Sequence, residues 1–127
     1  MTNEENKSLN ERHPKLGGIY PACDSGWFNL VDVLCYELQR QTDKHGAPQL
    51  EVIQIKEKLG GLRFQVQAIA PKDHDTTEEP RPSPTQRALI SMAERLSYLT
   101  CEKCGRPGST QEDREWIQTL CAEHAVE

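Results

Sequence analysis

The sequence predicts an α+β fold: two helices packed on a β-hairpin, or small antiparallel sheet, followed by a compact Cys/His-rich element. Three observations lead to this fold: two apolar stripes at helical spacing, a Gly-Gly pair between two strand-like runs, and two closely spaced Cys/His pairs. We expect one domain with three parts. Residues 1–15 form a flexible polar tail, residues 16–100 the α+β core, and residues 101–127 an element packed on that core.

The first helix follows a turn-rich lead-in, and Asp24 or Ser25 can cap its N-terminus. Its apolar residues recur at steps of three and four, which is typical of one buried helical stripe. They are Trp27, Leu30, Val31, Leu34, Cys35 and Leu38. Gly46 permits a left-handed cap and Pro48 cannot continue a helix, so we expect the helix to end at this point.

Two strand-like runs, residues 50–59 and 62–70, flank Gly60-Gly61, which is typical of a two-residue hairpin turn. Pairing about this turn places apolar residues opposite apolar ones and polar residues opposite polar ones. The apolar pairs are Leu59–Leu62, Ile55–Val66 and Ile53–Ala68, and the polar pairs are Lys58–Arg63, Lys56–Gln65 and Gln54–Gln67. Glu57 then faces Phe64 on the apolar side, and we expect its carboxylate to tilt out or to pair with an arginine.

Residues 71–82 are charged and interrupted by prolines, which indicates a surface loop. The sequence Ser83-Pro84-Thr85-Gln86 then predicts a helix start, with a capping box and proline at the first helical position. The stripe of this second helix consists of Leu89, Met92, Ala93, Leu96 and Leu99. We expect both helices to turn their stripes onto the apolar face of the hairpin.

Two pairs of metal-binding residue types follow the second helix. Cys101 and Cys104 form a Cys-x-x-Cys pair, and Cys121 and His124 form a Cys-x-x-His pair. Three thiols and one imidazole are the ligand set of a closed, structural zinc site. Only 35% of the residues are apolar, so the buried core is small for the length of the chain. A bound metal ion would add stability that this core does not supply. We expect Trp116 and Leu120 to pack over the site.

Disulfides are the alternative for these cysteines. The chain carries an odd number, five, and neither a signal-peptide pattern nor a membrane-spanning run is visible. We therefore predict a cytoplasmic protein that binds Zn²⁺ through Cys101, Cys104, Cys121 and His124.

The charge pattern narrows the class of partner. A net charge of −5 disfavours general phosphate binding and favours a protein partner that meets the chain by charge complementarity. On the polar face of the hairpin, Lys56, Lys58 and Arg63 form a small basic patch beside Gln65. These four residues are the candidate partner-binding surface, and the alternative is a solvated sheet face.

An enzyme is the least favoured class. A catalytic zinc site keeps one position open, whereas four protein ligands close the site predicted here. The chain also lacks the His-x-Glu motif of zinc deaminases and the His/Asn grouping of HNH-type nucleases. We predict no catalytic residue and no enzymatic activity. A nucleic-acid-binding zinc ribbon, with Lys103, Arg106 and either Trp116 or Phe64 as further contacts, stays open as the alternative.

Several motifs together resemble a group of small, mostly uncharacterised bacterial and prophage proteins. The shared pieces are Gly26-Trp27-Phe28, the run Ile55-Lys56-Glu57-Lys58-Leu59-Gly60-Gly61-Leu62-Arg63-Phe64, Ala93-Glu94, Cys101-Glu102-Lys103-Cys104-Gly105, and Trp116 with Thr119-Leu120-Cys121 and His124. The resemblance spans about residues 17–124 and implies a recurring module linked to phages or mobile elements. In that setting we expect an immunity or inhibitor-type protein that neutralises a toxin, a defence protein or a host factor.

Overall fold

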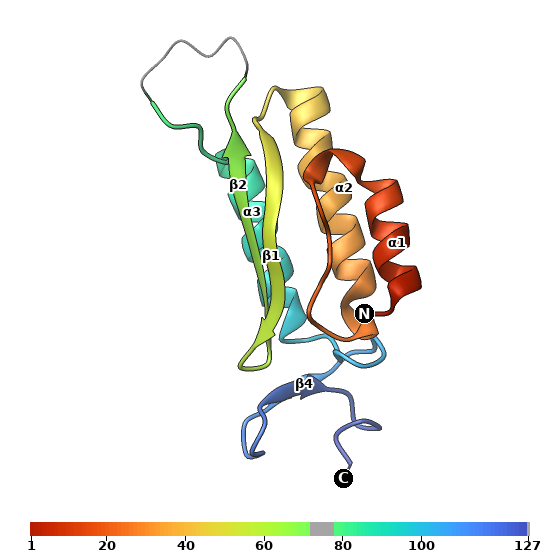
Figure 1. The fold of residues 1–127 in the computed structure, drawn as a ribbon. Coiled ribbons are helices and arrows are strands. Elements are labelled where there is room, and N and C mark those ends of the chain that lie inside the picture. Colours follow the sequence, from red (N-terminus) through yellow and green to blue (C-terminus); the bar gives the residue numbers. More distant parts are fainter. Residues whose placement is uncertain (72–77, 127) are drawn as a thin grey trace.

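The computed structural model is an α+β fold, in which a β-hairpin packs against helices and a second small sheet lies at the turn end of the hairpin (Figure 1). It describes residues 1–71 and 78–126, so residues 72–77 of the predicted loop lie outside the described residues. The helices are α1 (Asn3–Arg12), α2 (Phe28–His45) and α3 (Pro84–Ser97), with 3-10 turns at Pro14–Leu16 and Ser25–Trp27. The strands are β1 (Gln49–Lys58), β2 (Gly61–Ile69), β3 (Ser109–Gln111) and β4 (Gln118–Leu120).

Helix α2 supplies the helical side of the core, as its stripe predicts. Val31, Leu34, Cys35 and Leu38 are buried against the apolar face of the hairpin. The helix ends at Gly46, whose φ of 73° is the left-handed cap conformation. Its start differs from the prediction, because a 3-10 turn precedes α2 and no side chain of Asp24 or Ser25 caps it.

The first residues are not the flexible tail that the sequence predicts. They form α1, which begins with a capping box between Thr2 and Glu5 and buries Leu9 completely. After α1, the buried His13 contacts Asp32 of α2, and Arg12 pairs with the other carboxylate oxygen of Asp32 at 2.7 Å. The polar composition concealed this helix, since Leu9 is its only buried residue and polar contacts provide much of the remaining attachment. Among them, the Asn10 side chain donates to the carbonyl of Ile19 and accepts from the Ile19 N–H.

The hairpin turn lies one residue earlier than predicted, so the predicted register is wrong. Leu59 and Gly60 are the two turn residues, with φ of 52° and 88°, and Lys58 pairs with Gly61. Gly61 is the first residue of β2, and a Cβ there would lie 2.2 Å from the Tyr98 ring, so only glycine fits at this position.

The corrected register changes which residues face each other. Ile55 pairs with Phe64, Lys56 with Arg63, and Glu57 with Leu62, while an irregularity at Ile53 leaves that side chain 53% exposed. Instead of pairing with an arginine, Glu57 accepts a hydrogen bond from the backbone N–H of Gly60 at 2.8 Å, which closes the turn.

Helix α3 starts with the predicted capping box of Ser83 and Gln86, with Pro84 at the first helical position. Its orientation differs from the prediction. Of the apolar stripe only Ala93 is fully buried, whereas Met92, Leu96 and Leu99 are 55%, 41% and 62% exposed.

The buried face of α3 is polar instead, because it satisfies the free edge of β2. Ser97 Oγ accepts a hydrogen bond from the Leu62 N–H and Glu94 accepts one from the Phe64 N–H, both at 2.9 Å. Gln86 is also buried and donates to the carbonyl of Pro48 at 3.0 Å. Helix α3 therefore binds the sheet edge through side-chain hydrogen bonds and leaves most of its apolar stripe outside the core.

Candidate metal centre

The C-terminal element, residues 101–126, is built from two turns that each carry one pair of candidate ligands. In the first turn the Gly105 N–H donates to the carbonyl of Cys101 at 2.9 Å, with Gly105 at a φ of 84°. In the second, the Ala125 N–H donates to the carbonyl of Cys121, also at 2.9 Å. Strands β3 and β4 pair antiparallel between the turns and bring them together.

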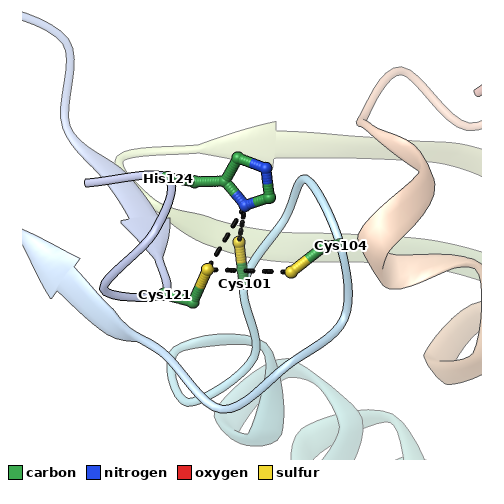
Figure 2. A group of neighbouring side chains, drawn as sticks. All are labelled: Cys101, Cys104, Cys121 and His124. Atoms are coloured by element: carbon green, nitrogen blue, oxygen red, sulfur yellow. Dashed lines mark hydrogen bonds between the residues drawn. The ribbon is translucent and has the colours of Figure 1, made fainter. Parts of the chain in front are cut away.

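The structure brings all four predicted ligands together. Figure 2 shows the three sulfur atoms and the ring of His124 turned toward one another. Cys121 Sγ lies 3.2 Å and Cys101 Sγ 3.6 Å from His124 Nδ1, and Cys104 Sγ lies 3.7 Å from Cys121 Sγ. All four ligand atoms lie within 4.8 Å of one another.

These separations fit a tetrahedral ion. With metal–sulfur bonds of about 2.3 Å and metal–nitrogen bonds of about 2.0 Å, tetrahedral geometry spaces sulfur atoms about 3.8 Å apart and sulfur from nitrogen about 3.5 Å apart. Cys101 and Cys121 are buried, His124 is half-buried and Cys104 is exposed. The cluster can therefore hold a metal ion with four protein ligands and no open position.

The local electrostatics favour deprotonated thiols at two of the cysteines. Burial alone raises the pKa of Cys101, but hydrogen bonds from the backbone N–H groups of Cys121, Cys104 and Lys103 lower that pKa to about 6. The His124 N–H lowers the pKa of Cys121 in the same way. The neighbouring Cys121 and Cys101 thiols raise the pKa of His124. Thiolates are the forms that bind a metal, so this arrangement favours the binding of a metal cation.

The pKa of Cys104 moves in the opposite direction. The Arg106 N–H lowers it, but burial and hydrogen bonds with Cys101 and Cys121 raise the pKa above its ordinary value. Three thiols this close cannot all ionise without a cation between them, because like charges repel at short range.

The element is fixed to the core at close backbone contacts that no motif search anticipates. A Cβ on Gly26 would lie 2.2 Å from the carbonyl oxygen of Cys101, so the two backbones touch. The Gly26 N–H donates to the carbonyl of Glu102 at 2.6 Å, and the Trp27 indole N–H donates to the carbonyl of Thr100 at 2.9 Å.

The hairpin turn makes the second contact with the metal element. Thr119 of β4 is buried and donates its hydroxyl to the carbonyl of Gly60 at 2.7 Å. The Glu102 N–H donates to the carbonyl of Thr119 at 2.9 Å, which joins this contact to the first ligand turn. The turn of the hairpin and the first ligand turn are thus linked through a single buried threonine.

Glu102, between the first two ligands, is the least expected residue of the site. It is 3% exposed, and its Oε2 accepts a hydrogen bond from the Asp24 N–H at 3.0 Å. No donor among the described residues reaches its Oε1. Burial raises the pKa of this carboxyl, so the folded chain carries an energetic cost at this position when the carboxyl is ionised.

The predicted cover of the site is right for one residue and wrong for the other. Leu120 is buried in a cluster with Cys101 and Cys121. Trp116 is 65% exposed and does not shield the thiols. It precedes β4 rather than forming part of it, so the strand alternation does not turn its ring inward.

The two remaining cysteines stand apart from the cluster. Cys23 and Cys35 are both buried, and burial raises the pKa of each thiol to about 12. Both are therefore protonated at neutral pH and unsuited to nucleophilic chemistry.

The predicted partner-binding residues share one face of the hairpin despite the changed register. Lys56 pairs with Arg63, Lys58 with Gly61, and Gln54 with Gln65, all on the face opposite the buried Ile55, Leu62 and Phe64. Lys58 and Gln65 are exposed, whereas Lys56 and Arg63 are half-buried. The Arg63 guanidinium donates to the Tyr98 hydroxyl at 3.1 Å. Partner binding at this face stays a prediction.

None of the helices within residues 1–71 and 78–126 combines the length and the apolar character that crossing a membrane requires. Compared with protein-family models, curated proteins and solved structures, the chain matches none of them at a significant level. The function is therefore inferred from the chain's own residues.

Proposed function

We propose that the chain is a zinc-stabilised protein-interaction module without enzymatic activity, in which Zn²⁺ joins the two ligand-bearing turns of the C-terminal element. The observation that carries the zinc assignment is the convergence of three thiols and one imidazole within 4.8 Å. A set of mainly sulfur donors in tetrahedral spacing selects zinc over hard cations such as Mg²⁺, which prefer oxygen ligands. Four protein ligands leave no site for a reacting water, so the role of the metal is structural.

A protein partner is the binding function that the surface supports best. The hairpin face presents Lys56, Lys58, Arg63 and Gln65 on a sheet supported from behind by the core, and such a rigid surface loses little entropy on binding. The resemblance to prophage proteins favours an immunity or inhibitor role, in which this face covers an acidic surface of a toxin, a defence protein or a host factor.

The nucleic-acid alternative receives less support. Phe64 is 3% exposed, so it cannot stack on a base. Lys103 lies 3.5 Å from Asp24, and Arg106 donates to Glu123 at 2.9 Å, so carboxylates already offset both cations. Trp116 remains as an exposed ring, but a single aromatic side chain makes a poor stacking platform for a nucleic-acid strand.

Thiol counting on metal-loaded and chelated protein tests the zinc proposal. In loaded protein we expect no fast-reacting thiol, and after chelation we expect three, from Cys101, Cys104 and Cys121. Cys23 and Cys35 should react only in denaturant, because burial raises the pKa of each to about 12. A Cys104→Ala variant should lose zinc, whereas Cys35→Ala should lose stability but keep zinc. Equal zinc content in wild type and Cys104→Ala would refute the four-ligand site.

Affinity capture from the native host tests the partner proposal. The tagged wild type should retain one stoichiometric protein, and Lys56→Glu/Lys58→Glu should release it. The matched control is Lys7→Glu/Lys44→Glu, which makes the same charge change at lysines of α1 and α2. If both double variants keep the partner equally, the hairpin face is only solvated. Capture of nucleic acid that dissociates at high salt would favour the alternative.

A further inference from the structure

Strand β2 has one edge that the rest of the fold covers only in part. Within residues 1–71 and 78–126, β1 is the only strand that pairs with β2, and Figure 1 shows α3 behind this hairpin. At the edge away from β1, the side chains of Ser97 and Glu94 in α3 accept hydrogen bonds from two N–H groups of β2, both at 2.9 Å. Those donors belong to Leu62 and Phe64, so α3 satisfies the half of the edge that lies nearer the hairpin turn.

The other half of this edge carries donors without acceptors. N–H groups alternate in direction along a strand, so those of Val66 and Ala68 point away from β1 like that of Phe64. The irregularity at Ile53 adds its extra residue to β1, so the alternation in β2 continues past it. In the part of the chain that the structure describes, no group accepts a hydrogen bond from either N–H. An open edge of this kind can pair with one further strand.

Arg87 of α3 adds a cation beside this open half of the edge. Val66, Arg87 and Ile90 line one hollow of about 560 Å³. The side chains of arginine and isoleucine offer no acceptor, and among the described residues no hydrogen bond joins the Ser91 hydroxyl to the edge. Arg87 is exposed, and no carboxylate of the described residues lies within ion-pair distance of it. The backbone N–H groups and the guanidinium therefore present donors that lack acceptors.

The spacing of the backbone donors selects an extended chain as the ligand. Val66 and Ala68 are two residues apart, which in a strand places their N–H groups about 7 Å apart. Alternate carbonyl groups of an extended peptide have the same spacing, whereas a helix rises only about 1.5 Å per residue. A second copy of β2 would supply no carboxylate for Arg87, because Gly61–Ile69 contains neither Asp nor Glu. The chain's own strand is therefore a poor ligand for this edge.

We infer that this edge binds a short extended segment of a partner protein that carries an acidic side chain. Carbonyl groups of the segment accept from the N–H groups of Val66 and Ala68, as when a strand is added to a sheet. The acidic side chain pairs with Arg87, whose planar guanidinium matches a carboxylate in geometry. This charge has a defined place, because Glu94 lies seven residues, or about 10 Å, further along α3.

The inference is independent of the proposed function. The proposed partner surface consists of Lys56, Lys58, Arg63 and Gln65 on the polar face of the hairpin, whereas the peptide site lies on the edge of β2 beside α3. Neither the metal nor any of these four side chains contributes to the peptide contacts. Failure of one proposal therefore leaves the other intact.

Amide spectra of the full, metal-loaded, ¹⁵N-labelled chain test the site with two synthetic peptides. Both are capped eight-residue peptides of alternating valine and threonine, in which one central residue is glutamate in the first and lysine in the second. At up to about 1 mM, the glutamate peptide should shift the amide signals of Val66 and Ala68 and slow their hydrogen exchange. The lysine peptide should bind at least about fivefold more weakly. Equal binding of both peptides, binding of neither, or shifts confined to other residues would each overturn the site.

A charge reversal with a matched control tests the Arg87 contact. Arg87→Glu and Arg95→Glu make the same change at two exposed arginines of α3, and Arg95 lines a different hollow. Arg87→Glu should reverse the preference, so that the lysine peptide binds more tightly than the glutamate peptide, whereas Arg95→Glu should bind like the wild type. An equal effect of both changes would overturn the Arg87 contact.

Removal of one backbone donor tests the strand pairing. Ala68→Pro deletes an N–H at an edge position, where proline is tolerated because that N–H has no partner in the fold. The glutamate peptide should bind this variant at least about fivefold more weakly than the wild type. Ala70→Pro, just beyond the end of β2, is the control and should bind the peptide normally. Unchanged binding in Ala68→Pro would overturn the pairing of the peptide with β2.

Discussion

The contact between Gly26 and the first ligand turn provides the sharpest test of how the metal element is held. In Gly26→Ala the new Cβ would lie 2.2 Å from the carbonyl oxygen of Cys101 and 2.3 Å from that of Glu102. Both neighbours are backbone atoms and cannot rotate away. The contact therefore has to open from 2.2 Å to the ordinary 3.4 Å or more, which separates the turn from the start of α2.

That separation breaks the hydrogen bonds that cross the junction. The Gly26 N–H to Glu102, the Asp24 N–H to the Glu102 carboxylate and the Trp27 indole to Thr100 are 2.6, 3.0 and 2.9 Å long. Each is worth about 1 kcal/mol net, so we expect the free energy of unfolding to fall by about 3 kcal/mol. Urea denaturation of the metal-loaded protein measures this value.

Gly18→Ala is the matched control for this measurement. Its new Cβ meets only the ring of Tyr20, which is 70% exposed and free to move. We expect a change within about 0.5 kcal/mol. If Gly26→Ala is as stable as Gly18→Ala, the backbone contact between the core and the metal element is wrong.

Three further predictions test single features of the fold. Leu9→Ala should lower the free energy of unfolding by about 2–5 kcal/mol in denaturant titrations, because Leu9 is the one residue of α1 that is fully buried in the core. The exposed Lys7→Ala should cost less than about 0.5 kcal/mol, and equal losses would mean that α1 is not docked. Leu59→Asn should raise Tm by about 3–5 °C, because asparagine tolerates the left-handed φ of 52° better than leucine, and a lower Tm would contradict the turn assignment. Glu102→Gln should be more stable than wild type at pH 7, because burial raises the pKa of the Glu102 carboxyl. The wild type therefore loses stability as the pH rises above 4.5, the ordinary pKa of this carboxyl, and the difference between the two proteins should vanish below that pH. Glu123→Gln, which removes an exposed carboxylate that pairs with Arg106 in the same element, is the control and should not be more stable than wild type at pH 7.

The sequence by itself determined the features that depend on local spacing. The stripe of α2, the capping box of α3 and the Gly46 cap each follow from residues within a few positions of one another. The same holds for the ligand set, since a Cys-x-x-Cys and a Cys-x-x-His pair each place two donors on one tight turn. These patterns carry their own geometry, and the structure reproduces it.

Only the tertiary structure decided the features that depend on distant neighbours. The need for glycine at position 61 comes from Tyr98, which fills the space beside it in the strand, while Leu59 and Gly60 form the turn. The outward stripe of α3 depends on the open edge of β2, whose N–H groups draw Ser97 and Glu94 inward. For α3, this hydrogen-bonding requirement from far along the chain outweighed the local hydrophobic pattern, because a buried N–H without a partner costs more than an exposed methyl group.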